Sequence, residues 1–215
     1  MRTTLAVLLM LVTAGTAAAD AHNEVMVGSY TRALRASSAN AVTENSLGGG
    51  VLGYARELDL GLMPKLQTWA TAGFAWGEAD GTMFSTLTTH LSTQTFSFGG
   101  RAQYNVFRHL AVGGRLDLGP SRAGLTLTEG PRTLHDSAWG VATTAAVTLD
   151  ARMLAFPGFK LGLRAELGYT MASKVDLAPA EANDSSMIQL EMSQASLGHL
   201  DVSGKYFSVT MLSQF

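Results

Sequence analysis

The chain has 215 residues, and its 15 Lys and Arg against 17 Asp and Glu give a formal net charge of −2. This charge argues against a nucleic-acid-binding protein, because such proteins usually carry a basic patch. Charged residues make up 15% of the chain, well under the roughly 25% of an average soluble domain, and 23 residues are glycine. The absence of cysteine excludes disulfides, thiolate metal sites and thiol catalysis, and the body has no apolar run long enough for a membrane-spanning helix.

The first residues have the pattern of a secretory signal peptide. Arg2 provides a positive charge, a short apolar run follows, and small-residue cleavage sites end at Ala19 and at Ala21. The apolar run is too short to span a bilayer, as is usual for signal peptides. We therefore predict a cleaved signal peptide over residues 1–19 and a mature domain over residues 20–215, with cleavage after Ala21 as the alternative.

Apolar and polar residues alternate along much of the remaining chain, which is the pattern of β-strands with two different faces. In chain order, the predicted strands cover 25–34, 52–62, 66–76, 94–106, 110–118, 139–149, 159–171 and 207–215. The registers of the first and third strands stay open, since Trp69 falls on the polar face of the third. A soluble β-sandwich also alternates, but its exposed face would normally carry far more charge.

The predicted connections alternate between long and short. The long ones span about 35–50, 77–93, 119–137 and 172–200, and the short ones centre on 63–65, 107–109 and 154–158. Bacterial outer-membrane barrels show this asymmetry, with short periplasmic turns and long external loops. We therefore predict an all-β fold: a single antiparallel up-and-down transmembrane β-barrel of eight strands, with ten as the alternative. An even strand number places both mature termini in the periplasm.

Aromatic residues support two belts at the membrane interfaces, as spanning strands require. One belt lies next to the predicted long connections and comprises Tyr54, Trp76, Trp139 and Tyr169. The other lies next to the short turns and comprises Tyr104, Phe107, Phe156 and Phe159. In a soluble sandwich these side chains would favour the middle of the core.

The C-terminus alternates and stops on an aromatic residue, through Phe207, Val209, Met211 and Phe215. This segment resembles the C-terminal assembly signal of bacterial outer-membrane barrels, although Ser213 stands where that pattern usually has an apolar residue. The resemblance implies recognition of the last strand by the barrel-assembly machinery. The mature chain as a whole resembles the small eight-stranded barrels of the OmpA transmembrane domain and OmpX type.

The inward face of the predicted strands carries charges of both signs. These residues are Glu57, Asp59, Arg101, Arg115, Asp117, Lys160, Arg164 and Glu166, with Gln103 among them. The interior of an eight-stranded barrel is just wide enough for its own side chains. We therefore predict that the charges pair across a filled lumen. A small channel for ions or hydrophobic solutes along the same charges is the alternative.

Two short motifs raise the question of catalysis. His90-Leu91-Ser92 resembles the His-x-Ser motif of outer-membrane lipid A deacylases, in which the His acts as base on the Ser, but the Glu of that family is missing where Arg101–Tyr104 stand. His135-Asp136 resembles the Asp/His pairs of barrel proteases, yet adjacent residues in a loop set no geometry. No His spacing suits a metal. We therefore expect no enzyme, no cofactor and no metal, and a lipid- or peptide-modifying barrel enzyme is the remaining alternative.

The fourth long connection is acidic and carries apolar residues near period two, which predicts a hairpin standing above the membrane as a surface for an external protein partner. Contact with lipopolysaccharide is the alternative role of this segment. The sequence thus predicts a monomeric integral outer-membrane barrel with a structural or surface-interaction role. Its expected partners are outer-membrane lipid and lipopolysaccharide and, during biogenesis, the barrel-assembly machinery.

Overall fold

The computed structural model describes residues 23–43, 46–60, 63, 65–83, 87–177, 180–181 and 199–215. The predicted signal peptide and most of the fourth long connection therefore lie outside the described residues. Within the described part, eight long strands follow one another: β1 (Asn23–Leu34), β2 (Ser46–Leu58), β3 (Leu66–Met83), β4 (Leu87–Phe107), β5 (Leu110–Glu129), β6 (Arg132–Phe156), β7 (Phe159–Ala172) and β11 (Gly204–Gln214). Short elements occupy two of the connections: α2 (Ser37–Asn40), β8 (Val175–Asp176), β9 (Ala180–Glu181) and β10 (His199–Leu200).

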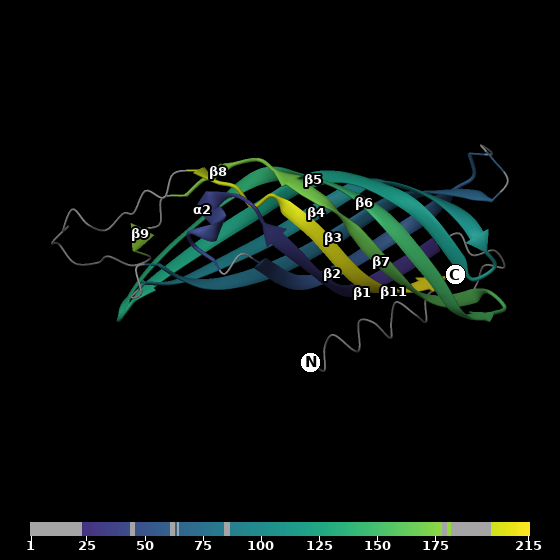
Figure 1. Cartoon of the computed structure of the whole chain (residues 1–215), viewed down its shortest axis with the longest axis horizontal. Helices are drawn as coiled ribbons and strands as arrows, with labels where there is room; N and C mark the ends of the chain where they lie inside the picture. Colours follow the sequence, from purple (N-terminus) through teal and green to yellow (C-terminus); the bar gives the residue numbers. More distant parts are fainter. Residues whose placement is uncertain are drawn as a thin grey trace.

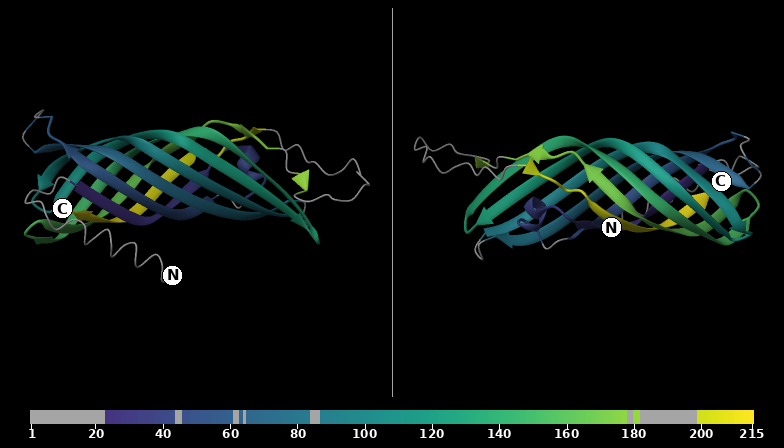
Figure 2. Two further views of the ribbon diagram at one scale, coloured as in Figure 1. Left: turned by 180° about the vertical axis from the view of Figure 1, so that it is seen from behind. Right: turned by 45° about the horizontal axis from the view of Figure 1, so that its top comes forward.

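The eight long strands close into a barrel (Figure 1). Each pairs antiparallel with its neighbours in the order β5-β4-β3-β2-β1-β11-β7-β6, and β5 pairs with β6 to complete the ring. The seam joins the first strand to the last, and the backbone N–H groups of Asn23 and Phe215 each donate to the other residue's carbonyl over 3.0 Å. A view from behind and a view with the top tilted forward show the same slanted strands around the barrel (Figure 2). The predicted eight-stranded up-and-down barrel is confirmed.

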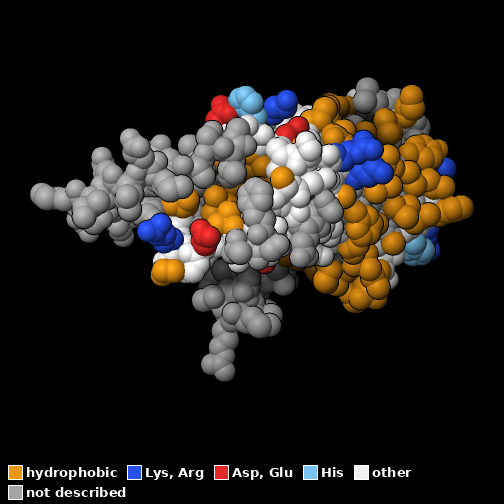
Figure 3. Space-filling view, turned by 60° about the vertical axis from the view of Figure 1, so that its left-hand side comes forward, with side chains coloured by type: hydrophobic (Ala, Val, Ile, Leu, Met, Phe, Trp, Pro, Cys, Tyr) orange, Lys and Arg blue, Asp and Glu red, His pale blue; other side chains and the backbone are white. Residues whose placement is uncertain are grey.

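Over the half of the barrel that carries the short turns, apolar side chains face outward and polar ones face the lumen. On β5, Leu116 and Leu118 are about 60% exposed, whereas the intervening Asp117 is buried. The outward residues form an apolar belt, which comprises Leu52, Trp76, Phe96, Phe98, Leu116, Leu118, Trp139, Val141, Val147, Leu167, Met171, Phe207, Val209 and Met211. Figure 3 shows hydrophobic side chains gathered toward this end of the molecule. Such a belt is the outer surface of a membrane-spanning barrel. No described helix has the length and apolar character needed to cross a membrane.

Two predicted long loops are wrong, because the strands continue through them. β3 and β4 stay paired as far as Met83 and Leu87, and β5 and β6 as far as Glu129 and Arg132. The turn between β5 and β6 needs only two further residues, and Gly130 adopts a φ of 55° there, which glycine tolerates without steric cost. The polar, glycine-containing composition of these segments suggested loops, but their alternation of faces continues.

We call the extended part of these four strands the distal sheet, defined as residues 77–83, 87–93, 123–129 and 132–138. Its faces are reversed relative to the apolar belt. Leu91, Leu125 and Leu127 point inward and are almost completely buried, while polar residues such as Thr126 face outward. The inward side chains belong to an apolar core that includes Leu47, Val42, Val175, Leu177, Leu200 and Val202.

Connections fold over the same end of the barrel and cover its mouth. The segment after α2 is held to β4, because the Thr89 hydroxyl donates to the carbonyl of Val42. The Asp201 N–H donates to the Ser38 hydroxyl over 3.4 Å, and Arg32 on β1 donates to the Val202 carbonyl over 3.4 Å. These contacts fix α2 and the residues before β11 over the lumen, so the mouth is filled with protein.

The structure corrects one residue of the predicted aromatic belts. Tyr54 was expected beside a long connection, yet it lies four residues before the end of β2, toward the short turns, and its hydroxyl donates to the Asn23 side-chain oxygen over 2.6 Å. The error arose because β2 begins at Ser46, six residues before the predicted strand. Trp76 and Trp139 face outward as expected, and Tyr169 lies three residues from the end of β7. Tyr104, Phe107 and Phe156 are exposed and Phe159 half-buried, all close to short turns.

The last strand presents the predicted alternation to the outside. Phe207, Val209 and Met211 are exposed, and Phe215 is partly exposed at the seam. Leu212 is an apolar residue on the inward face of this strand: it points into the lumen and packs with Met26, Ala55 and Trp69. Recognition of this strand by an assembly machinery stays a prediction.

Candidate functional site

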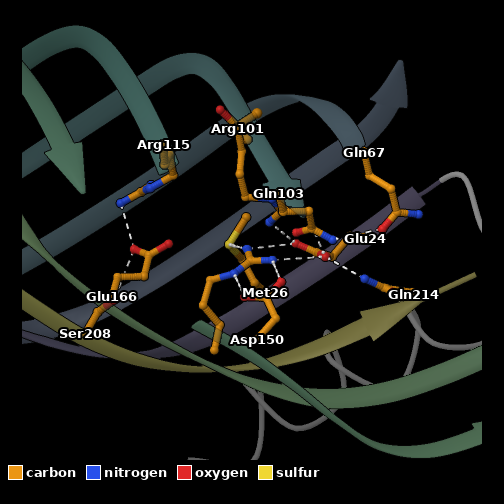
Figure 4. A network of polar contacts seen from close by, with 12 residues as sticks. Glu24, Met26, Gln67, Arg101, Gln103, Arg115, Asp150, Glu166, Ser208 and Gln214 are labelled. Atoms are coloured by element: carbon orange, nitrogen blue, oxygen red, sulfur yellow. Dashed lines mark hydrogen bonds and ion pairs between the residues drawn. The ribbon is translucent and has the colours of Figure 1, made fainter. Parts of the chain in front are cut away.

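The lumen holds a network of buried charges that spans the barrel (Figure 4). At its centre lies Glu24 of β1, which accepts hydrogen bonds from Arg101 of β4 at 2.6 and 3.0 Å and from Arg164 of β7 at 2.9 and 3.3 Å. Arg164 also binds Asp150 of β6 through two bonds of 2.6 Å, and Gln214 of β11 donates to Glu24 over 2.9 Å. One carboxylate thus ties together strands from opposite sides of the ring.

A second group of charges lies beside the first. Arg115 of β5 makes ion pairs with Asp117 at 2.6 Å and with Glu166 of β7 at 2.8 Å. Glu166 also accepts bonds from the hydroxyls of Tyr206 and Ser208, and Asp117 accepts one from Thr71 at 2.6 Å. A buried ion is tolerated only where it is paired and its remaining lone pairs are satisfied. Short, partly bidentate contacts give every charge of both groups an oppositely charged partner. Glu166 Oε1 and the Nε atoms of Arg101 and Arg115 are buried without a hydrogen-bond partner among the described residues.

The predicted lumenal residues divide into those that the structure brings together and those that it does not. Arg101, Arg115, Asp117, Arg164 and Glu166 belong to the two groups. Glu57 lies nearer the short turns and accepts a bond from Gln67 at 3.0 Å. The prediction that Asp59 lies in the lumen is wrong, because β2 ends at Leu58 and Asp59 is exposed beyond it. Lys160 is half-buried near the start of β7.

Sequence reasoning missed Glu24 and Asp150, two acids at the centre of the first group. Glu24 shares the inward face of Met26, but the predicted first strand started one residue too late to include it. Asp150 follows the predicted end of its strand by one residue, on the same face as Thr148. Extending each alternating segment by one residue would have found both. Arg32, also missed, is buried against the Tyr30 ring and makes no ion pair among the described residues.

His90 and Ser92 of the first motif considered for catalysis lie on the outward face of the distal sheet. His90 Nδ1 lies 2.7 Å from Asp80 Oδ1 across β3 and β4, so a base with an orienting carboxylate is present. The Ser92 hydroxyl, however, donates to the Gly124 carbonyl at 3.4 Å instead of approaching His90.

His135 and Asp136 were considered together, but they lie on opposite faces of β6. His135 contacts the Thr126 hydroxyl at 3.0 Å, and Asp136 accepts a bond from the Ser137 N–H. No cluster of three metal-ligating side chains occurs among the described residues. Neither motif therefore presents an assembled catalytic or metal site.

The sequence matches no protein-family model and no curated protein. Among solved structures, the chain is similar to Ail, the attachment invasion locus protein of Yersinia pestis, at 11% identity and a TM-score of 0.51, with 91% of this chain and 99% of that one covered. Ail is an outer-membrane β-barrel. This chain has the fold of an outer-membrane β-barrel. The outer membrane protease OmpT of Escherichia coli (9% identity, TM-score 0.49, 92% and 97% covered) and the translocator domain of autotransporter NalP from Neisseria meningitidis (10%, 0.45, 100% and 95%) also match.

The lumen of the barrel contains a small cavity. Between the second charged group and Arg32 lies a cavity of about 40 Å³, lined by Met26, Thr71 and Tyr206 among others. A water molecule takes up roughly 30 Å³ of liquid, so the cavity is of the size of one or two waters. Trp69 is buried in the lumen with Met26, Ala55 and Leu212, and the guanidinium carbon of Arg101 lies 4.9 Å from its ring.

Proposed function

We propose that the protein is an integral outer-membrane barrel with a filled lumen, whose role is structural or in surface interaction, and that it neither transports solutes nor catalyses a reaction. The observation that carries the proposal is the pairing of the lumenal charges. Arg101, Arg164 and Arg115 each bind a carboxylate from another strand, across the space that a pore would need. The apolar core beneath α2 closes the mouth above them.

Planar-bilayer recordings with the refolded chain test the filled lumen. We expect no stable conductance from pure protein whose folded state is verified by a heat-dependent shift in gel mobility, with a large-lumen barrel as the positive control. Reproducible single-channel steps that scale with the amount of folded protein would overturn the filled-lumen proposal and favour a channel instead.

The distal sheet supports a role at the cell surface, because its outward face is polar and stands beyond the apolar belt. With the distal sheet outside the cell, both mature termini and the short turns are periplasmic. An epitope inserted at Gly130, in the turn between β5 and β6, should be detected on intact cells. The same epitope inserted at Arg108, in the turn between β4 and β5, should be detected only after the outer membrane is opened. The reverse result would invert the proposed orientation.

Against catalysis stands the geometry of His90 and Ser92. A nucleophile must lie within hydrogen-bond reach of its base, and the Ser92 hydroxyl is turned toward Gly124. We therefore expect that purified protein leaves lipid A and test peptides intact. Hydrolysis that is lost in both the His90→Ala and the Ser92→Ala variants would refute this part of the proposal.

A further inference from the structure

Cross-strand rows of outward residues mark where the apolar belt ends. Register aligns Trp76, Gln94, Arg122 and Trp139 across β3, β4, β5 and β6; we call this the boundary row. On the belt side, the next outward residues are Phe74, Phe96, Pro120 and Val141. On the distal side, the next two rows are Glu78, Ser92, Gly124 and Ser137, then Asp80, His90, Thr126 and His135. Tryptophans at an apolar-to-polar change mark the level of lipid headgroups.

A groove opens on the outer wall at this row. Its volume is about 200 Å³, and its lining consists of Ser92, Gln94, Arg122, Gly124, His135 and Ser137. Gly124 keeps it open, because a Cβ there would lie 2.9 Å from the Ser92 hydroxyl oxygen and 3.6 Å from the Ser137 Cβ. At roughly 30 Å³ for each water, the groove has room for a tetrahedral anion together with the atoms that carry it.

Arg122 faces this groove without a carboxylate partner among the residues that the structure describes. Its Nε and Nη2 both donate to one acceptor, the Ser137 hydroxyl oxygen, at 3.2 and 2.7 Å. The same edge of Arg164 in the lumen binds two oxygens of Asp150 at 2.6 Å each. A guanidinium fork suits two oxygens of a carboxylate or phosphate. In Arg122 that fork is directed at a single neutral oxygen.

We propose that the Arg122 groove binds a phosphate group of a lipid headgroup in the outer leaflet, as carried by the lipid A part of lipopolysaccharide. Arg122 supplies the bidentate fork, and the Ser137 hydroxyl and the Gln94 amide supply further donors. Phosphate is the anionic group that lies where acyl chains meet polar headgroup, which is the level of the boundary row. The proposal rests on the outer-membrane placement proposed above. Glu78, which faces Ser92 across β3 and β4, opposes an anion at one edge.

Native mass spectrometry of the refolded chain in detergent tests the site with purified bis-phosphorylated lipid A as the probe. We expect a 1:1 complex whose dissociation constant rises about ten-fold in Arg122→Gln, the loss of a charge-assisted bidentate contact. Arg56→Gln is the matched control, because Arg56 is also outward and exposed but lies at the short-turn end; it should bind as the wild type does. Glu78→Gln should bind more tightly.

Lipid A stripped of phosphate should bind the wild type and Arg122→Gln equally weakly, which would support phosphate recognition. Equal affinity of the wild type for both lipids would overturn it. Displacement of lipid A by millimolar inorganic phosphate, lost in Arg122→Gln, would assign the site to free phosphate and overturn the lipid source. A heat-dependent gel shift verifies that each variant is folded, so a failed binding result remains separate from a failure of the barrel itself.

Discussion

The two halves of the barrel use the same strands with opposite chemistry. On β5 the odd-numbered residues face inward throughout: Asp117 does so beside the apolar belt, and Leu125 does so in the distal sheet. The even-numbered residues face outward, from Leu118 in the belt to Thr126 in the distal sheet. The backbone geometry is therefore constant, and only the residue types change. The change fits the proposed surroundings, with lipid outside one half and water outside the other.

The contrast also separates two sources of stability. The distal sheet buries an apolar core, as a water-soluble domain does. In the half that carries the apolar belt, the outward apolar side chains are exposed and would face lipid in the proposed placement, and the lumen is held by buried ion pairs and hydrogen bonds. Substitutions that are equivalent in strand position should therefore differ in cost between the halves.

The largest effect is expected from breaking the lumenal network. Arg164→Ala leaves Glu24 and Asp150 partly unpaired in the lumen, and such a loss costs about 3–5 kcal/mol. Urea titration in lipid vesicles should show this drop in the free energy of unfolding. Arg56→Ala, on the outward face, should change it by less than about 0.5 kcal/mol. Equal effects of the two variants would contradict a role of the network in stability.

The second-largest loss of stability is expected from a cavity in the apolar core beneath the distal sheet. Leu91 is completely buried, so Leu91→Ala should cost about 2–5 kcal/mol through lost transfer energy and an unfilled cavity. Leu116→Ala in the belt should cost clearly less, since acyl chains can fill the space. The same vesicle titration measures both. A larger loss for Leu116→Ala would mean that the two halves are not stabilised differently.

A charge on the outward face tests the boundary itself. Leu116→Arg places a cation against lipid and should cost about 2–4 kcal/mol if it lies near the bilayer midplane. Thr126→Arg, outward on the same strand but in the distal sheet, should stay within about 0.5 kcal/mol of the wild type. Similar costs for both positions would place the distal sheet inside the membrane.

The smallest effect concerns the exposed pair of His90 and Asp80. Exposed ion pairs contribute less than about 1 kcal/mol, so His90→Ala should leave unfolding nearly unchanged. A loss above about 2 kcal/mol would indicate that this pair fixes the hairpin of β3 and β4.

Much of the fold could be predicted from period-two alternation, because a strand keeps its faces whatever surrounds it. The segments 110–118 and 159–171 were recognised in this way. The distal sheet was missed because its outward Thr, Ser and Gly residues resemble loop composition, although the alternation through Leu125 and Leu127 continues. In the distal sheet, the alternation of faces was therefore a better predictor of strands than the amino-acid composition.

The lumenal site was predictable by residue type but not by pairing. Alternation placed Arg101 and Arg164 inside, yet their common partner Glu24 is 77 and 140 residues away in sequence. Which inward residues meet across the lumen depends on the stagger of the closed ring. A single sequence does not encode that stagger in any local pattern. Glu24 was missed for a second reason, since it lies near the start of β1, where few preceding residues show the alternation.

The seam between β1 and β11 sets the order in which the molecule can be built. Glu24 on the first strand accepts hydrogen bonds from side chains of β4, β7 and β11, and the residue on β11 is 190 residues away in sequence. Contacts between residues so far apart in sequence form slowly, because the chain must lose conformational entropy in closing the loop before the contacts contribute stabilising free energy. Glu24 therefore gains its full set of partners only when the last strand docks. We therefore expect closure of the wall and completion of the Glu24 contacts to occur together, late in folding.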